Sequence, residues 1–285
     1  MESCEKIGFV NLENDAKPEK KHVDLEQMYS KAEETIQNSK INIDDFVDIY
    51  EDMVERDKET AMSRKEKFAS RLDDSGRECK KYADVMEAIL VDSVNASDWL
   101  GEDVKAMNTT DYDDFENGID VIAEMTKEGG FKKHLGLAMD ATFAKRVSGK
   151  FNDIKGKIVS GRMSKVKYYK TEDYKGSLTN IPHVVIGVSL GKIKELGEMW
   201  VNGETDKLKN HPVQYQILEE MIIQLETFEK YAYKYDKPEL AEVYKDRCET
   251  LKTIKAKKEE ALPDTGERDY IFKNIKKEMD RFLDK

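Results

Sequence analysis

Residues 183–189, His-Val-Val-Ile-Gly-Val-Ser, form a short and continuous apolar run. Its β-branched residues and its length are typical of a strand at the centre of a sheet, where neither face meets water. Ser189 follows the run and is a suitable cap for the next helix, whose apolar positions include Ile193, Leu196 and Trp200. The run therefore predicts a core in which a sheet is covered by helices.

Three further segments have strand character. Residues 118–125 and 134–143 are short apolar stretches separated by Gly129-Gly130, which favours an antiparallel pair. Residues 165–170 alternate between charged and apolar or aromatic side chains, as in a strand. Between them, residues 150–159 have apolar side chains at helical spacing. This order predicts an α/β (α+β) fold with a central mixed four-stranded sheet and a crossover helix, flanked by N-terminal and C-terminal helical segments.

The chain of 285 residues divides by pattern into four parts. We expect a flexible lead-in, a helical segment, an α/β domain and a C-terminal helical segment, at residues 1–20, 21–80, 81–203 and 204–285. No apolar run approaches the roughly 18–20 residues that a membrane span needs. The three cysteines are far apart, which argues against disulfides and predicts a cytoplasmic protein: Cys4, Cys79 and Cys248.

Charge is distributed unevenly along the chain. The net charge of −11 argues against a protein that coats nucleic acid non-specifically. However, residues 131–175 contain 12 Lys or Arg and 4 Asp or Glu, whereas residues 81–130 contain 13 acids and 3 Lys. A basic segment thus follows an acidic one directly.

Two of the expected strands carry one aspartate each, Asp120 and Asp140. Asp140 lies in an otherwise apolar strand, where a carboxylate is costly to bury unless it is paired or binds a metal. Carboxylates from neighbouring strands, with phosphate oxygens and waters, suit Mg²⁺ or Mn²⁺, and such an ion can activate water. Glu124, at the end of its strand, is a possible third metal ligand. The alternative is structural, with these acids paired to backbone N–H groups or lysines.

The order of elements over residues 81–200 resembles the core of the PD-(D/E)XK nuclease superfamily. That order is a helix, two acid-bearing strands, a crossover helix and a further strand. The resemblance implies metal-dependent hydrolysis of phosphodiester bonds, with Asp120 and Asp140 as the motif acids and Glu87 as an additional acid on the preceding helix. The motif lysine is replaced by Thr142, so Lys145 or Lys167 would have to substitute for it. The first strand of the usual meander is not visible in the sequence.

Basic residues near the second acid are candidates for contacts with a nucleic-acid substrate. They lie beside Asp140, in the crossover helix and in the strand after it: Arg146, Lys150, Lys155, Lys157, Lys165 and Lys170. A solvated basic face that balances the acidic helices explains the same residues equally well. An acidic turn at residues 112–118 does not have the spacing of an EF-hand loop.

A second function of a different class fits the same sequence. In it, the α/β domain is a non-catalytic scaffold, and the long helices from Val213 onward are a protein–protein interaction module or a homodimer interface. An apolar stripe on the first of these helices could serve an internal core or such an interface: Met221, Ile222, Leu225 and Phe228.

Overall fold

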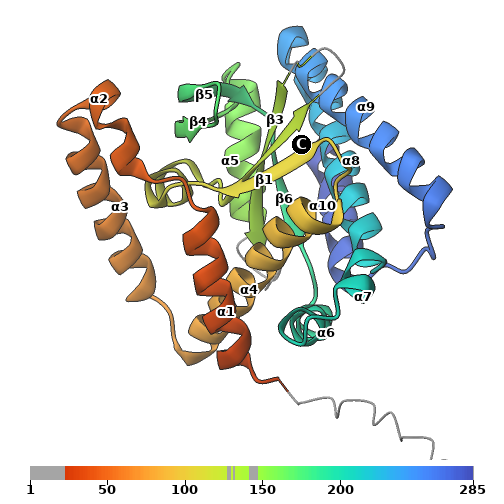
Figure 1. The fold of residues 1–285 in the computed structure, drawn as a ribbon. Helices are drawn as coiled ribbons and strands as arrows, with labels where there is room; N and C mark the ends of the chain where they lie inside the picture. The colour runs from red at the N-terminus through yellow and green to blue at the C-terminus, as the bar shows by residue number, and fades with distance from the viewer. Residues whose placement is uncertain (1–22, 127–129, 131, 141–146, 285) are drawn as a thin grey trace, which may run out of the picture.

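The structure is a computed structural model that describes residues 23–126, 130, 132–140 and 147–284. Its centre is a four-stranded sheet of order β1-β2-β3-β6, with a separate two-stranded sheet, β4-β5, beside it (Figure 1). The strands are β1 (Val104–Asn108), β2 (Val121–Thr126), β3 (Lys132–Asp140), β4 (Ser164–Lys170), β5 (Lys175–Ile181) and β6 (His183–Gly187).

The central sheet combines an antiparallel meander with one parallel strand. β1 pairs with β2 and β2 with β3 in antiparallel fashion, whereas β6 runs parallel to β3. The connection from β3 to β6 includes helix α5 (Val147–Val159) and the β4-β5 hairpin. The predicted mixed four-stranded sheet with a crossover helix is therefore confirmed.

The membership of the sheet differs from the sequence prediction in one strand. The segment 165–170 is β4, which pairs with β5 instead of joining the central sheet. The fourth strand is β1, which has only five residues and in which the exposed Lys105 interrupts the apolar pattern. β5 is equally hard to recognise, because most of its residues are polar or lack a large side chain.

Helices precede, interrupt and follow the sheet. One segment at residues 43–46 is a 3₁₀-helix (η1, Ile43–Phe46), and one at residues 113–117 is a π-helical turn (η2, Asp113–Asn117). The remaining helices are α1 (Leu25–Ser39), α2 (Val47–Tyr50), α3 (Met53–Ala69), α4 (Asp74–Ser97), α6 (Leu190–Val201), α7 (Thr205–Lys209), α8 (Val213–Lys234), α9 (Pro238–Ala261) and α10 (Tyr270–Asp284). Of the helices described, none is sufficiently long and apolar to cross a bilayer.

One hydrophobic cluster joins most of these elements. It extends from Val23, before α1, to Phe282 in α10, and it includes residues of α4, the central sheet, α5 and α8. The apolar stripe of α8 belongs to this cluster, since Met221, Leu225 and Phe228 are completely buried. The stripe therefore serves the internal core. In Figure 1, α8, α9 and α10 lie together at one side of the sheet, and α1 to α3 lie at the other.

The outer edge of β6 is covered by polar side chains of α8. Gln224 accepts a hydrogen bond from the N–H of Val185 and donates one to its carbonyl oxygen, both at 2.8 Å. Glu220 accepts from the N–H of Gly187 at 3.0 Å, and Gln216 donates to the Gly187 carbonyl at 3.2 Å. These side chains are four residues apart on α8, a rise of about 6 Å, and their backbone partners are two residues apart on β6, a rise of about 6.6 Å. The spacing along the helix therefore matches the spacing along the strand edge.

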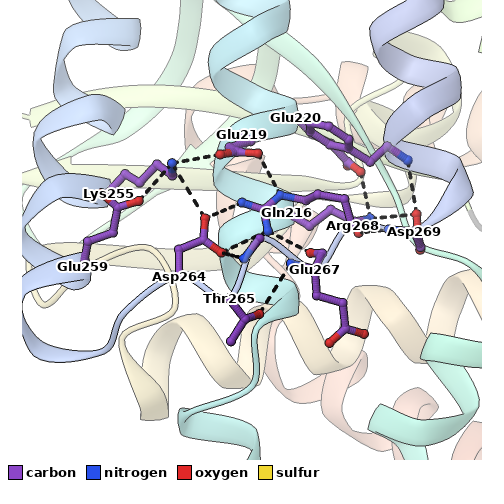
Figure 2. A network of polar contacts seen from close by, with 12 residues as sticks. Gln216, Glu219, Glu220, Lys255, Glu259, Asp264, Thr265, Glu267, Arg268 and Asp269 are labelled. Atoms are coloured by element: carbon purple, nitrogen blue, oxygen red, sulfur yellow. Dashed lines mark hydrogen bonds and ion pairs between the residues drawn. The ribbon is translucent and has the colours of Figure 1, made fainter.

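The end of this ladder joins a network that ties α8 to the segment before α10 (Figure 2). Asp269 caps α10, accepts from the N–H of Ser189 at 2.7 Å and accepts from Gln216 at 3.0 Å. Arg268 donates to Glu219 at 2.7 Å. Charges and hydrogen bonds at this network thus fix the C-terminal helix against β6 and α6.

The packing of α6 on α1 leaves no room for a side chain at Gly197. A Cβ atom there would lie 2.2 Å from Sδ of Met28, which is buried. We expect Gly197→Ala to lower the free energy of unfolding by about 2 kcal/mol, because the buried Met28 side chain would have to shift. The matched control is Gly191→Ala on the same helix, where no described atom lies within 4 Å of the added Cβ. Urea denaturation of both variants measures the difference; equal stability of the two would contradict this packing.

Candidate functional site

Four carboxyl side chains gather where α4, the π-helical turn and the start of β2 meet. Asp84 and Glu87 are three residues apart on α4, which sets them on one side of the helix. Asp114 belongs to η2, and Asp120 directly precedes β2. Their negative charges act on one another, since Asp120 raises the pKa of Asp84, of Glu87 and of Asp114. We call these four residues the acidic cluster.

Glu87 is the most deeply buried member, with 8% of its surface exposed. Its carboxylate accepts a hydrogen bond from Nδ2 of Asn108, at the end of β1, over 2.5 Å. Burial, followed by the negative charge of Asp120, raises the pKa of Glu87 to about 8. At neutral pH this side chain therefore holds its proton, although a glutamate in water is ionised.

Asp114 and Asp120 form a carboxyl pair. They share a hydrogen bond, and burial together with the charge of Asp120 raises the pKa of Asp114 well above its usual value. A hydrogen bond between two carboxyl groups requires one proton between them. The proximity of Asp120 therefore favours the protonated form of Asp114.

The π-helical turn that presents Asp114 is held by its neighbour Asp113. The buried Asp113 carboxylate accepts hydrogen bonds from the backbone N–H groups of Lys167 and Tyr168, at 2.7 and 3.1 Å. It also accepts from the side chain of Asn117 at 2.6 Å. The turn is thus fastened to β4. Single π-helical turns are frequent at functional sites, where they redirect a side chain.

A lysine lies among the acids. Lys80 forms an ion pair with Asp84 and is close enough to Asp114 and Glu87 for their charges to act on it. Burial alone would lower the pKa of Lys80, but its interactions with nearby acids, first of all Asp84, outweigh burial and raise the pKa. Lys80 therefore remains a cation and offsets part of the negative charge of the cluster.

His183, the first residue of β6, pairs with Gly136 in the middle of β3 and is near enough to Asp120 for the charge of Asp120 to act on its ring. Its Nδ1 is 3.4 Å from Oγ of Ser164, and its buried Nε2 has no hydrogen-bond partner within the described ranges. Burial lowers the pKa of His183 to about 3, and the charge of Asp120 opposes this effect. The ring is therefore neutral, and the positive charges of Lys157 and Lys150 on α5 also act on it.

The structure brings together some of the residues chosen from the sequence. Glu87 and Asp120 are both in the acidic cluster. Asp120 donates its N–H to the Leu137 carbonyl, which continues the β2–β3 register and sets it opposite Ala138. The backbone of Asp140 is two residues further along β3, paired with Gly187, so the two motif positions lie at the same end of the sheet.

Other chosen residues lie elsewhere. Glu124 is four residues along β2 from Asp120, or about 13 Å, where its carboxylate pairs with Lys132 at 3.2 Å and accepts a hydrogen bond from Tyr169. Lys167 is in the separate β4-β5 sheet and pairs with Asp57 at 2.5 Å. Three tyrosine rings surround its ammonium group at 5.2–5.3 Å: Tyr50, Tyr112 and Tyr168.

Several of the chosen basic residues have partners within the protein. Lys155 lies over the ring of Phe282 at 4.4 Å, Lys157 pairs with Asp153 at 2.7 Å, and Lys170 pairs with Asp45 at 2.6 Å. Lys165 is exposed on β4. Thr142, Lys145 and Arg146 lie outside the described residues.

Three members of this site are not among the residues predicted from the sequence: Asp84, Asp114 and Lys80. Asp84 and Glu87 have the i, i+3 spacing of one helix face, which is a detectable signal. The acidic turn that contains Asp114 is also visible, but its approach to Asp120 depends on the π-helical turn and on Asp113. Within the described residues, no group of three or more His, Cys, Asp or Glu side chains is arranged to hold a metal ion.

Comparisons with known proteins give no relative. No protein-family model matches the chain, and no curated protein or solved structure matches it significantly.

Proposed function

We propose that the chain is a metal-dependent nuclease-like protein that hydrolyses phosphodiester bonds in nucleic acid at the acidic cluster. The observation that carries the proposal is the crowding of carboxyl groups around Asp120, where burial and the negative charge of Asp120 raise the pKa of Asp114 and of Glu87. Such groups are costly to bury, and they are concentrated where catalysis or metal binding requires them.

The order of elements gives independent support. α4 is followed by the β1-β2-β3 meander, by α5 and by the parallel strand β6. β1 supplies the meander strand that the resemblance to the PD-(D/E)XK nucleases implies and that is not visible in the sequence. Asp120 at the start of β2 and Glu87 on the preceding helix have the positions that the resemblance gives to the acids.

The donor chemistry suits Mg²⁺ or Mn²⁺, because these ions prefer carboxylate oxygens. Asp120 and Asp114 would hold the ion, with Asp140 from β3, and the proton between the first two would leave. The ion would supply an activated water and neutralise charge on the phosphate. Lys80 would favour the charged form of Asp84, and Glu87, protonated at neutral pH, could donate a hydrogen bond to a phosphate oxygen.

The proposal extends to partners and location. A nucleic acid would be the substrate, and the spacing of the cysteines favours the cytoplasm. A homodimer through the C-terminal helices stays a prediction; because the apolar stripe of α8 is in the core, such a dimer would have to use other surfaces.

Cleavage assays test the proposal. Purified protein is incubated with labelled single-stranded and duplex DNA and RNA, with Mn²⁺, with Mg²⁺ or with EDTA. We expect divalent-dependent cleavage that Asp120→Asn reduces at least about 100-fold, since a ligand carboxylate is lost. Asp140→Asn tests the second motif position in the same way. The control is Glu124→Gln, on the same strand but outside the acidic cluster.

Thermal unfolding gives a readout that does not depend on activity. A bound ion stabilises the folded state by mass action, so Mn²⁺ should raise the Tm of the wild type and not that of Asp120→Asn. An unchanged Tm with Mn²⁺ in the wild type, together with cleavage that survives Asp120→Asn, would rule out the proposed site.

A further inference from the structure

A cavity of about 770 Å³ lies between the end of α1, η1, α3 and the turn after β1. Its volume is within the range of small-ligand sites, roughly 300–1,000 Å³. Lys58, Met62 and Lys65 line it from one face of α3, Lys40 lines it from the end of α1, and Tyr112 lines it from the turn. In Figure 1, α3 stands beside α1 at the margin of the fold.

The lining is positively charged, in a chain whose net charge is −11. Three of the described lining residues are lysines and one, Asp111, is an acid. The carboxylate of Asp111 is shared between two of these lysines, because it pairs with Lys40 and lies 3.6 Å from Lys65. Lys58 pairs with Glu55 at 2.8 Å and with Asp44, neither of which lines the cavity. The cavity thus has more ammonium groups than carboxylates, and exposed pairs of this kind exchange partners at little cost.

The cavity is next to the acidic cluster. Burial raises the pKa of Glu87 and of Asp84, and the positive charges of Lys40 and Lys65 respectively offset part of that rise. A direct chain of hydrogen bonds also runs between the two sites, from Ser39, the neighbour of Lys40, to Asn108 and on to Glu87. A ligand held in the cavity would therefore be within reach of the carboxyl groups.

We propose that this cavity binds a phosphate group of a single nucleic-acid strand and holds that strand for the acidic cluster. The identification of the strand as substrate rests on the proposed function. Lysine ammonium groups bind phosphate as point charges. Beside them, Met62, Ile41, Ile43 and Tyr112 give the lining an apolar part against which a sugar or base can pack. The volume suits about two nucleotides and not the width of a duplex.

Fluorescence anisotropy with a short labelled single-stranded oligonucleotide, in EDTA and low salt, tests the proposal. We expect the double variant Lys58→Gln/Lys65→Gln to bind at least about 10-fold more weakly, and the slope of log K against log salt to fall by about 1.4. The control is Lys276→Gln/Lys277→Gln on α10, which removes the same charge from an exposed surface. Both double variants are checked for an unchanged Tm.

Three outcomes would overturn the inference. The first is equal affinity of the cavity variant and the wild type. The second is tighter binding of a duplex that the cavity variant does not weaken. The third is a rise in Tm with inorganic phosphate or a nucleoside monophosphate without any binding of the oligonucleotide, which would assign the cavity to a free phosphorylated ligand.

The two proposals fail in different ways. Binding in EDTA requires no metal and should survive Asp120→Asn. Lysine-dependent binding without cleavage would leave the cavity proposal standing and reject the nuclease. Cleavage without lysine-dependent binding would leave the nuclease proposal standing and reject the cavity proposal.

Discussion

We expect Gln224→Met to lower the free energy of unfolding by about 3 kcal/mol, because the variant loses the side-chain amide of Gln224. Gln224 is completely buried and bonds both the N–H and the carbonyl oxygen of Val185 at 2.8 Å. Methionine has nearly the same volume, so no cavity forms, but two buried backbone groups lose their partners. The N–H and the carbonyl oxygen each contribute the cost of an unsatisfied polar group.

Urea denaturation measures this loss, and Lys230→Met is the matched control. Lys230 is on the same helix and exposed, so its replacement should change stability by less than about 0.5 kcal/mol. Hydrogen exchange adds a local readout, because the Val185 amide should exchange faster in Gln224→Met. Equal stability of the two variants would mean that the hydrogen bonds of Gln224 to β6 contribute little.

The second large effect is a dependence of stability on pH that Glu87→Gln removes. In the unfolded chain the Glu87 side chain ionises near its ordinary pKa of 4.5, whereas in the folded protein burial and Asp120 raise this pKa to about 8. Between these values the folded state binds the extra proton, so the stability of the wild type falls as the pH rises. Glutamine keeps the oxygen that accepts from Asn108 and carries no charge.

We therefore expect Glu87→Gln to be more stable than the wild type by on the order of 3 kcal/mol at pH 8. The difference should shrink as the pH falls and disappear near pH 4.5, the ordinary pKa of the side chain. Denaturation curves at several pH values measure it, with the exposed Glu239→Gln of α9 as the control. A stability difference that does not change with pH would show that charge is not its source.

The sequence was most informative where a local pattern decides the structure. The run that begins at His183 is β6, and the glycine-bounded segment before Met125 is β2, because strand period and turn residues are local properties. β1 and β5 were missed because short strands with polar residues gain their stability from the neighbouring strands. The apolar stripe of α8 was visible, but a stripe does not reveal which surface covers it.

The same distinction holds for the site. Asp120 could be predicted from its place in an apolar strand, whereas Glu87 was implied only by the family resemblance. The position of Asp114 depends on a π-helical turn, which has no characteristic sequence period and so cannot be predicted from the sequence pattern. Lys167 and Glu124 were selected on strand position alone, and tertiary packing pairs them with Asp57 and Lys132.

The side-chain amides at the sheet margins also bear on how this protein can meet other chains. Gln224 occupies the edge of β6, and Asn95 of α4 does the same at the opposite edge, where it accepts from the N–H of Ala106 and donates to its carbonyl oxygen at 2.9 and 2.8 Å. Ile41 then donates to the carbonyl of Asn108. Exposed strand edges are templates for strand addition and amyloid growth. At these positions another chain finds no free backbone group, so the sheet resists aggregation through its edges.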